Sequence, residues 1–186
     1  MRVFVAMDVP EEVRRAIGEF VAKLEPVCRG ARWARVDGMH VTLKYIGEVT
    51  AEKVEQIKKE LEGVRSAEAV EMNFRGMGFF PNAKHPRVFW AGIEATPNLA
   101  EISAEMEKRM ERLGIAREER AFRPHLTLAR FKTEEGLAKL HEAIEKAGAV
   151  EFGSTRSSEF YLYESKLLRG GAEYTRLARF AFAAEK

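Results

Sequence analysis

The chain begins with an alternating pattern of hydrophobic residues that gives way to a helical one. Val3, Val5 and Met7 recur at every second position, which predicts a strand. A helix start follows, because Asp8 can cap a helix and Pro10 fits its first turn. Beyond it the hydrophobic residues recur three and four positions apart. This spacing predicts a helix with one buried face, formed by Val13, Ile17, Phe20, Val21 and Leu24.

The second half of the chain repeats this order of elements. A strand is predicted over Val88–Ile93, followed by a helix that Thr96–Pro97 opens and Gly114 ends. Two more helices are predicted after Thr50 and Thr133, because threonine often caps helices. The buried faces of these three helices consist of Leu99, Ile102, Met106, Met110 and Leu113; of Val54, Ile57, Leu61 and Val64; and of Leu137, Leu140 and Ile144.

Glycines mark the ends of the remaining strands. Gly76 and Gly78 interrupt one hydrophobic segment, and Gly170–Gly171 predicts a turn between two others. These strands are expected over Val70–Phe74, Ser158–Glu164 and Glu173–Phe180. The chain thus mixes strands with helices and ends in a hairpin, which is typical of an α+β fold.

An internal repeat organises these elements. Arg2–Ala6 is similar to Arg87–Ala91, and His40–Leu43 is similar to His125–Leu128, each pair at an offset of 85 residues. One short match arises easily by chance, but two matches at one offset indicate duplication. We therefore expect a duplicated unit of about 85 residues.

The repeat predicts the architecture. Residues 1–186 are expected to form a single bilobal α+β domain, in which repeats at roughly 1–85 and 86–171 are followed by a C-terminal strand. Each duplicated lobe should carry a small, mainly antiparallel sheet with helices on its outer face. A pseudo-twofold axis would relate the two lobes across a central groove.

Composition and charge narrow the class of protein. Hydrophobic residues make up 46% of the chain and charged residues 32%, which allows a buried core and excludes intrinsic disorder. The 31 basic and 29 acidic residues nearly cancel, so bulk charge does not indicate nucleic-acid binding. A single cysteine, Cys28, excludes an internal disulfide and a thiolate-rich zinc site.

The same features indicate a cytoplasmic protein. No stretch approaches the about 20 apolar residues of a membrane span, and the charged residues after Asp8 argue against a signal peptide. We therefore expect no membrane partner. Three Asn and one Gln beside many charged residues are typical of a thermophile.

Each histidine motif predicts a strand with one buried and one polar face. In the first motif the two faces carry Val41, Leu43 and Tyr45 on one side and His40, Thr42 and Lys44 on the other. In the second, Leu126 and Leu128 point inward while His125 and Thr127 share the opposite face. A twofold axis between the strands would bring two imidazoles and two hydroxyls to one groove.

These groups suit chemistry at phosphorus. Two imidazoles can act as base and acid in one step, and two hydroxyls can donate hydrogen bonds to phosphate oxygens. No carboxylate cluster accompanies the motifs, so neither a metal ion nor another cofactor is expected, and no Ser or Cys lies in a nucleophile motif. In-line displacement with one His on each side fits best. The alternative is a duplicated fold whose histidines only satisfy polar groups at strand edges.

The two motifs resemble the paired His-x-Thr-x signature of the two-histidine phosphoesterase superfamily. Within it, the chain is most similar to the RNA 2′,3′-cyclic phosphodiesterases, also called 2′-5′ RNA ligases, of bacteria and archaea. The similarity covers nearly the whole chain, and its main segments are Arg2–Pro10, His40–Val49, Phe80–Pro81, Arg123–Arg130 and Tyr163–Leu167.

This resemblance implies a bilobal α+β fold and an activity in RNA processing. The family opens a terminal 2′,3′-cyclic phosphate to a 2′-phosphate without metal, and some members join tRNA halves through a 2′-5′ bond. His40 and His125 are thereby the candidate catalytic residues. The candidate phosphate-binding residues are Thr42, Thr127, Arg130 and Lys44.

Two of the phosphate-binding candidates depend on details of the strands. Arg130 matches the family's common Arg and could neutralise a phosphate, but simple alternation places it opposite His125. A strand twist or a bulge is needed to bring it into the groove. Lys44 shares the face of His40 in the same simple alternation, with a solvated lysine as the alternative.

Several functional alternatives stay open at this level. The first is hydrolysis and the second is the reverse ligation, which passes through the same transition state. The third is a noncatalytic RNA or nucleotide-binding protein with the same groove. The expected partners are RNA ends, including tRNA, or cyclic nucleotides, with a nucleoside triphosphate in the groove as a further option, and the protein is expected to be a monomer. His40 is favoured as the acid and His125 as the base, although the pseudo-twofold makes them chemically alike.

Overall fold

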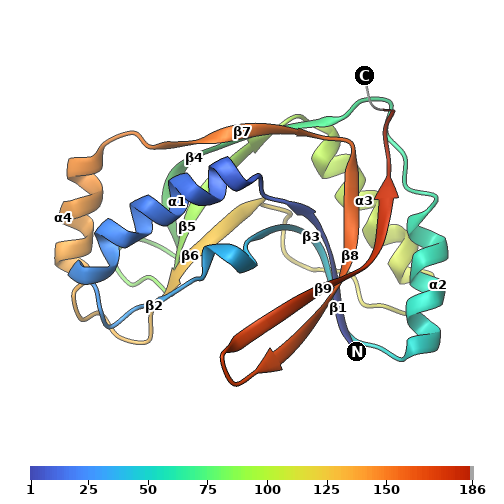
Figure 1. Cartoon of the computed structure of the whole chain (residues 1–186), viewed down its shortest axis with the longest axis horizontal. Helices are drawn as coiled ribbons and strands as arrows, with labels where there is room; N and C mark the ends of the chain where they lie inside the picture. Colours follow the sequence, from blue (N-terminus) through green and yellow to red (C-terminus); the bar gives the residue numbers. More distant parts are fainter. Residues whose placement is uncertain (185–186) are drawn as a thin grey trace.

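Two antiparallel sheets with α-helices packed around them make up the computed structural model, which describes residues 1–184 (Figure 1). The elements in chain order are β1 (Arg2–Asp8), α1 (Glu11–Leu24), η1 (Glu25–Val27), β2 (Arg32–Trp33), η2 (Val36–Gly38), β3 (His40–Glu48), α2 (Ala51–Leu61), β4 (Val70–Phe80), β5 (Val88–Ala95), α3 (Asn98–Glu111), β6 (His125–Arg130), α4 (Leu137–Ala147), β7 (Glu151–Ser157), β8 (Glu159–Leu168) and β9 (Gly171–Ala181).

The strand orders of the two sheets correspond. One sheet has the order β3-β1-β8-β9 and the other the order β2-β6-β5-β4-β7, and the neighbouring strands are antiparallel. In this arrangement β3, β1 and β8 match β6, β5 and β4. Each sheet therefore takes strands from both halves of the chain, since β8 joins the N-terminal strands and β4 joins β5 and β6. The predicted α+β class with two antiparallel sheets is confirmed.

The register corrects the offset at which the first strands correspond. Phe4 lies opposite Tyr45, and Val88 lies opposite Arg130, so β1 matches β5 at an offset of 84 residues while β3 matches β6 at 85. The similarity between Arg2–Ala6 and Arg87–Ala91 is thus out of register by one residue. Because a shift of one residue turns a side chain to the other face of a strand, Phe4 lies on the histidine side of its sheet, whereas Phe89 is buried in the core.

Only some helix starts follow the sequence expectation. Thr50 caps α2, because its Oγ1 accepts a hydrogen bond from the Lys53 N–H at 3.1 Å. Asp8 does not cap α1, whose N-cap is Pro10 without a side-chain hydrogen bond. Thr133 does not cap α4, which starts four residues later after Gly136 in a left-handed conformation, with φ of +79°.

Strands β4 and β8 continue past their predicted ends, and β2 and β7 were not predicted. β4 continues through both of its glycines to Phe80, and the indole of Trp90 fills the space that a Cβ at Gly78 would need. β7 was not predicted, since its sequence Glu151–Ser157 is mostly polar and pairs along one edge with β4.

The helices cover the faces of the sheets that lie away from the histidines. Helix α3 contacts β3, α2 contacts α3, and α1 contacts β7. Their apolar stripes join the inward faces of the strands in one core, which includes Val5, Ile17, Ile57, Phe89 and Met106. Among the described residues no helix is both long and apolar enough to cross a bilayer.

Candidate active site

His40 is the first residue of β3 and lies directly opposite Asp8 of β1. Its Nδ1 is 3.1 Å from the carbonyl oxygen of Gly38. Aromatic rings enclose the imidazole, with centroid distances of 4.4 Å to Tyr163, 5.2 Å to Tyr174 and 5.8 Å to Phe4. The ring is therefore held on three sides, which limits its rotation.

His125 is the first residue of β6 and lies opposite Gly92 of β5. Its Nδ1 is 2.6 Å from the carbonyl oxygen of Arg123. The ring of Phe80 meets it edge-on at 5.1 Å, and the Trp90 indole lies at 6.5 Å. This second histidine thus has an aromatic environment of its own.

Both imidazoles are oriented in the same way. In each case Nδ1 faces the carbonyl of the residue two positions earlier, and a carbonyl oxygen can only accept a hydrogen bond. In the neutral ring Nδ1 must therefore carry the proton, which leaves the lone pair on Nε2. The Nε2 atoms of His40 and His125 are free in this arrangement to take or give a proton.

A β-bulge follows the threonine of each motif. In β3, Thr42 lies opposite Ala6 and Lys44 opposite Val5, so that Leu43 is the extra residue. In β6 the register shift makes Leu128 the extra residue, between Thr127 and Ala129. The two strands show the same burial pattern, with two consecutive buried residues at the bulge.

The bulges decide which side chains reach the histidine faces. Because two consecutive residues point inward, the residue after them returns to the face of the His and the Thr. Arg130 is therefore exposed on the same face as His125 and Thr127, in agreement with the bulge that its candidate role requires. In β3 the corresponding residue is Tyr45, whose side chain is 57% exposed.

Lys44 does not lie on the face of His40, which corrects the sequence-based expectation. It is only 4% exposed, because the bulge turns it toward α3. Its Nζ donates hydrogen bonds to Glu107 Oε2 at 2.9 Å and to the carbonyl oxygen of Ala116 at 2.8 Å. Lys44 is thus part of a buried ion pair and cannot bind a phosphate from this position.

A polar network lies beside His40. Asp8 accepts hydrogen bonds from the hydroxyl of Tyr163 on one carboxylate oxygen and from the guanidinium of Arg176 on the other. Arg176 Nε also donates to the Tyr163 hydroxyl at 3.0 Å, and its guanidinium lies 4.1 Å above the Tyr161 ring. The network joins three strands of the sheet and fixes the position of the ring on which His40 packs.

The same surroundings shift the pKa values of His40 and Tyr163. Burial lowers the pKa of His40, and the negative charge of Asp8 opposes this shift while Arg176 adds to it. Burial and the hydrogen bond to Asp8 raise the pKa of Tyr163 to about 12, so its hydroxyl stays protonated and donates. A neutral His40 is therefore favoured in the free protein.

Several residues of these faces were not predicted from the sequence, among them Asp8, Tyr45, Tyr174 and Arg176. One signal was available, because Tyr45 and Arg130 stand at the same offset of 85 as the histidines. The other three come together only through cross-strand pairing. Trp90 was also missed; it lies opposite Thr127, and its Nε1 is buried without an acceptor among the described residues.

The remaining histidines lie outside the two motif faces. His85 is exposed and pairs with Glu134, and His141 Nε2 is 2.8 Å from the carbonyl oxygen of Ala83. Trp33 Nε1 donates to the Cys28 carbonyl at 3.0 Å, so this indole ties a loop to the core. These contacts are structural.

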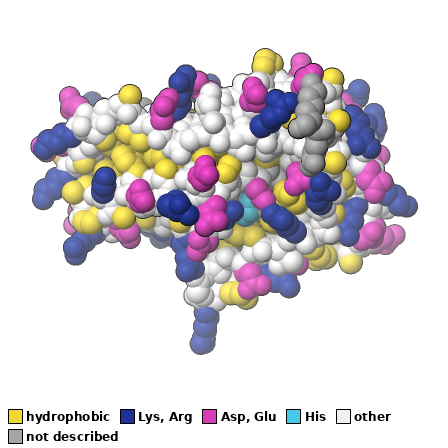
Figure 2. Space-filling model, turned by 45° about the horizontal axis from the view of Figure 1, so that its top comes forward, with side chains coloured by type: hydrophobic (Ala, Val, Ile, Leu, Met, Phe, Trp, Pro, Cys, Tyr) yellow, Lys and Arg dark blue, Asp and Glu magenta, His cyan; other side chains and the backbone are white. Residues whose placement is uncertain are grey.

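Figure 2 shows a histidine near the middle of the face that it presents, with charged side chains of both signs around it.

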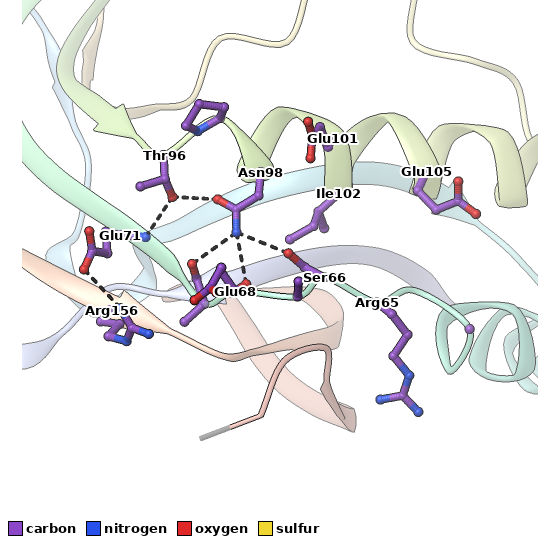
Figure 3. Close-up of a pocket in the computed structure, with 14 residues that line it drawn as sticks. Arg65, Ser66, Glu68, Glu71, Thr96, Asn98, Glu101, Ile102, Glu105 and Arg156 are labelled. Atoms are coloured by element: carbon purple, nitrogen blue, oxygen red, sulfur yellow. Dashed lines mark hydrogen bonds and ion pairs between the residues drawn. The ribbon is translucent and has the colours of Figure 1, made fainter. Parts of the chain in front are cut away.

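A separate cavity of about 830 Å³ lies beside the start of α3 (Figure 3). There Asn98 Nδ2 donates to Ser66 Oγ at 3.3 Å and to the carbonyls of Glu68 and Ala69 at 3.0 and 3.1 Å, which ties the preceding loop to the helix. No residue of either histidine motif lines this cavity. Across residues 1–184 no group of three or more His, Cys, Asp or Glu is placed to hold a metal ion.

Comparison with known proteins relates the whole chain to one family. Residues 5–166 match the model of the 2′-5′ RNA ligase superfamily. The RNA 2′,3′-cyclic phosphodiesterase of Methanocaldococcus jannaschii is 33% identical over 174 residues, which cover 94% of this chain and 96% of the relative.

Solved structures agree in fold over nearly the full length. TT0787 of Thermus thermophilus has a TM-score of 0.80 at 29% identity, covering 98% of both chains. E. coli LigT complexed with 3′-AMP has a TM-score of 0.79 at 29% identity and 97% coverage of both chains. The complex of LigT with ATP has a TM-score of 0.75 at 28% identity and 98% coverage of both.

Proposed function

Because the chain belongs to the 2′-5′ RNA ligase superfamily, we propose that His40 and His125 act as an acid–base pair on RNA 2′,3′-cyclic phosphate ends. The protein is an enzyme of the RNA 2′,3′-cyclic phosphodiesterase type, the activity for which its relatives are named. Hydrolysis of the cyclic end leaves a 2′-phosphate. The comparisons give no support to a noncatalytic binding protein.

One observation carries the site assignment. Two imidazoles start two matching strands, each with Nδ1 held by a carbonyl and each followed two residues later by a threonine on the same face. A structural role at strand edges does not require both rings to be oriented alike. Two equally oriented Nε2 atoms are what a step with one proton acceptor and one proton donor needs.

The proposed step is an in-line displacement at phosphorus. One neutral imidazole takes a proton from water as the water oxygen forms a bond to phosphorus. The bond from phosphorus to the 3′-oxygen breaks, and the other, protonated imidazole gives its proton to that oxygen. The hydroxyls of Thr42 and Thr127 and the guanidinium of Arg130 would stabilise the charge that develops on the non-bridging oxygens.

The burial of His40 bears on the roles of the two histidines. Its lowered pKa favours the neutral ring, which is the state of a base. The sequence-based assignment of His40 as the acid stays a prediction. The opposite assignment, with His40 as the base and His125 as the acid, is the one that a neutral His40 favours, and the pH profile distinguishes the two.

The ligation reaction uses the same groups in the same direction, with a different nucleophile. An RNA 5′-hydroxyl could replace water as the partner of the cyclic end, which would give the 2′-5′ bond of the superfamily name. The complexes of LigT with 3′-AMP and with ATP support a groove that accepts nucleotides. They leave RNA ends, tRNA halves and cyclic nucleotides as candidate substrates, and a nucleoside triphosphate as a further ligand.

The test is turnover of a short RNA that ends in a 2′,3′-cyclic phosphate, with excess chelator present. The expected product is the 2′-phosphate, formed at the same rate with and without chelator. Addition of a 5′-hydroxyl RNA to a parallel reaction reports ligation as a longer product. No turnover of the cyclic end under either condition would overturn the proposed function, and loss of turnover with chelator would overturn the metal-free step.

A further inference from the structure

The hairpin of β8 and β9 extends beyond the rest of its sheet (Figure 1). β1 pairs with β8 only as far as Ser165, so the segments Lys166–Leu168 and Gly171–Glu173 form a two-stranded ribbon. Such a ribbon alone is marginally stable in water. Here its turn is held by Arg35, whose guanidinium donates a hydrogen bond to the carbonyl of Gly170 at 2.6 Å.

The ribbon exposes two leucines on opposite faces. Leu167 is 73% exposed and Leu168 is 54% exposed. β8 alternates regularly from Tyr163, which packs on His40, so Ser165 and Leu167 share the histidine face while Leu168 lies on the reverse face. Leu167 is therefore not part of the hydrophobic core.

Tyr174 connects the ribbon to the site. It lies opposite Ser165 in β9, and its ring is 5.2 Å from the ring of His40. A Cβ at Gly38 would lie 2.8 Å from this ring, so the absence of a side chain at Gly38 lets the ring lie against the loop before β3. At 37% exposure, part of the Tyr174 ring is open to solvent.

The surface that runs from His40 along the hairpin combines aromatic, apolar and basic groups. Tyr174 and Leu167 provide the first two, while Arg35 is exposed and bonds to the turn at Gly170, and Arg169 is an exposed residue of the same turn. Aromatic rings that stack on bases, with cations for the phosphates, are the chemistry that binds single-stranded RNA. The nucleotides that precede a cyclic 3′ end must leave the site over some adjoining surface.

We propose that this surface, formed by Leu167, Tyr174, Arg35 and Arg169, binds the nucleotides that precede the cyclic phosphate. We refer to it as the hairpin surface. The proposal rests on the proposed function, because it assumes that an RNA end occupies the groove. Its consequence is a preference for RNA oligomers over cyclic mononucleotides, which share the reacting group but lack the preceding nucleotides that would cover Leu167.

The experiment compares Leu167→Asp with Leu168→Asp. Both variants change the charge by the same amount, on opposite faces of the same ribbon, so long-range electrostatics are matched. For each, kcat/KM is measured with adenosine 2′,3′-cyclic phosphate and with a short oligoadenylate that ends in the same group. The ratio of the two values, oligomer over mononucleotide, reports the contribution of the hairpin surface. Effects on the chemical step cancel in it, because both substrates carry the same reacting group.

The ratio is expected to fall about fivefold or more in Leu167→Asp and to stay at the wild-type value in Leu168→Asp. Tyr174→Ala should lower the affinity for a fluorescent oligoadenylate with a terminal 2′-phosphate by about fivefold to 100-fold, as the loss of one stacking partner predicts. Equal ratios in both leucine variants would overturn the proposal. So would a change of oligomeric state in Leu167→Asp, because the leucine would then face a second copy of the chain.

The affinity measurement keeps the two proposals apart. If the wild-type protein turns over neither substrate, the proposed function fails, and the hairpin surface is judged by whether Leu167→Asp weakens oligoadenylate binding more than Leu168→Asp does. If both substrates react and the ratio does not respond to Leu167→Asp, only the hairpin surface is wrong.

Discussion

Tyr45 and Arg130 occupy the same position in two matching strands. Each lies three residues after the threonine of its motif, beyond a bulge, and each returns to the face of its histidine. The two halves of the site thus share their imidazoles and hydroxyls but differ at this point, where one has a phenol and the other a guanidinium. A cation on one side only can break the chemical equivalence of the two histidines.

Arg130→Gln should lower kcat/KM for a cyclic-phosphate RNA by about tenfold to 100-fold, because it removes a charge-assisted hydrogen bond to the phosphate. Tyr45→Phe, at the matching position, keeps the ring and removes only a neutral hydroxyl. It should cost less than Arg130→Gln. Steady-state kinetics on one substrate compare the two, and equal effects would mean that the cation of Arg130 has no special role.

His40→Ala and His125→Ala should each reduce kcat by about 10²- to 10⁴-fold, since each removes one partner of the proton transfer. His85→Ala is the control, because this histidine is exposed and pairs with Glu134 away from both motifs. Circular dichroism checks that the variants fold. Activity within a few-fold of wild type in either motif variant would exclude the acid–base pair.

Asp8→Asn should move one limb of the pH profile of kcat/KM to lower pH. The carboxylate of Asp8 raises the pKa of His40, so its removal lowers that pKa further. If His40 is the base, it must be neutral, and the affected limb is the acidic one. A shift of the alkaline limb in its place would make His40 the acid.

Arg176→Gln provides the matched control for this shift. The positive charge of Arg176 lowers the pKa of His40, so its removal should move the same limb to higher pH. Both variants remove the ion pair between Asp8 and Arg176. Opposite shifts would therefore report electrostatics, whereas shifts in one direction would indicate a structural disturbance.

Lys44→Met should destabilise the protein and leave kcat/KM within a few-fold of wild type. It leaves Glu107, with a side chain only 15% exposed, without its cation. Breaking such a buried pair costs about 3 kcal/mol of unfolding free energy. Urea denaturation measures this, with Lys146→Met as the control at an exposed ion pair on α4. A large loss of activity without loss of stability would contradict this assignment and indicate that Lys44 binds the substrate phosphate.

Much of the fold could be predicted because its signals are local. The stripes that start at Val13 and at Leu99 follow the period of a helix, and both helices form there. The alternation at Val3 predicts β1 in the same way. β7 lacked such a signal, because its polar sequence becomes a strand only through pairing with β4.

The histidine motifs were also local signals, since His and Thr two residues apart in a strand must share a face. Lys44 is an exception to this alternation. Strict alternation puts it beside His40, and the bulge at Leu43 turns it into the core. Nothing within the motif itself distinguishes a regular strand from a bulged one.

Most helices and strands and the two His-x-Thr pairs could be predicted, because helical period, strand alternation and a repeated motif are properties of neighbouring residues. The rest of the site depends on how distant strands pair. Asp8 meets Arg176 across 168 positions of the chain, and Tyr174 reaches His40 from the last strand. Which residues face one another across a sheet depends on register, and register is a property of the paired strands together.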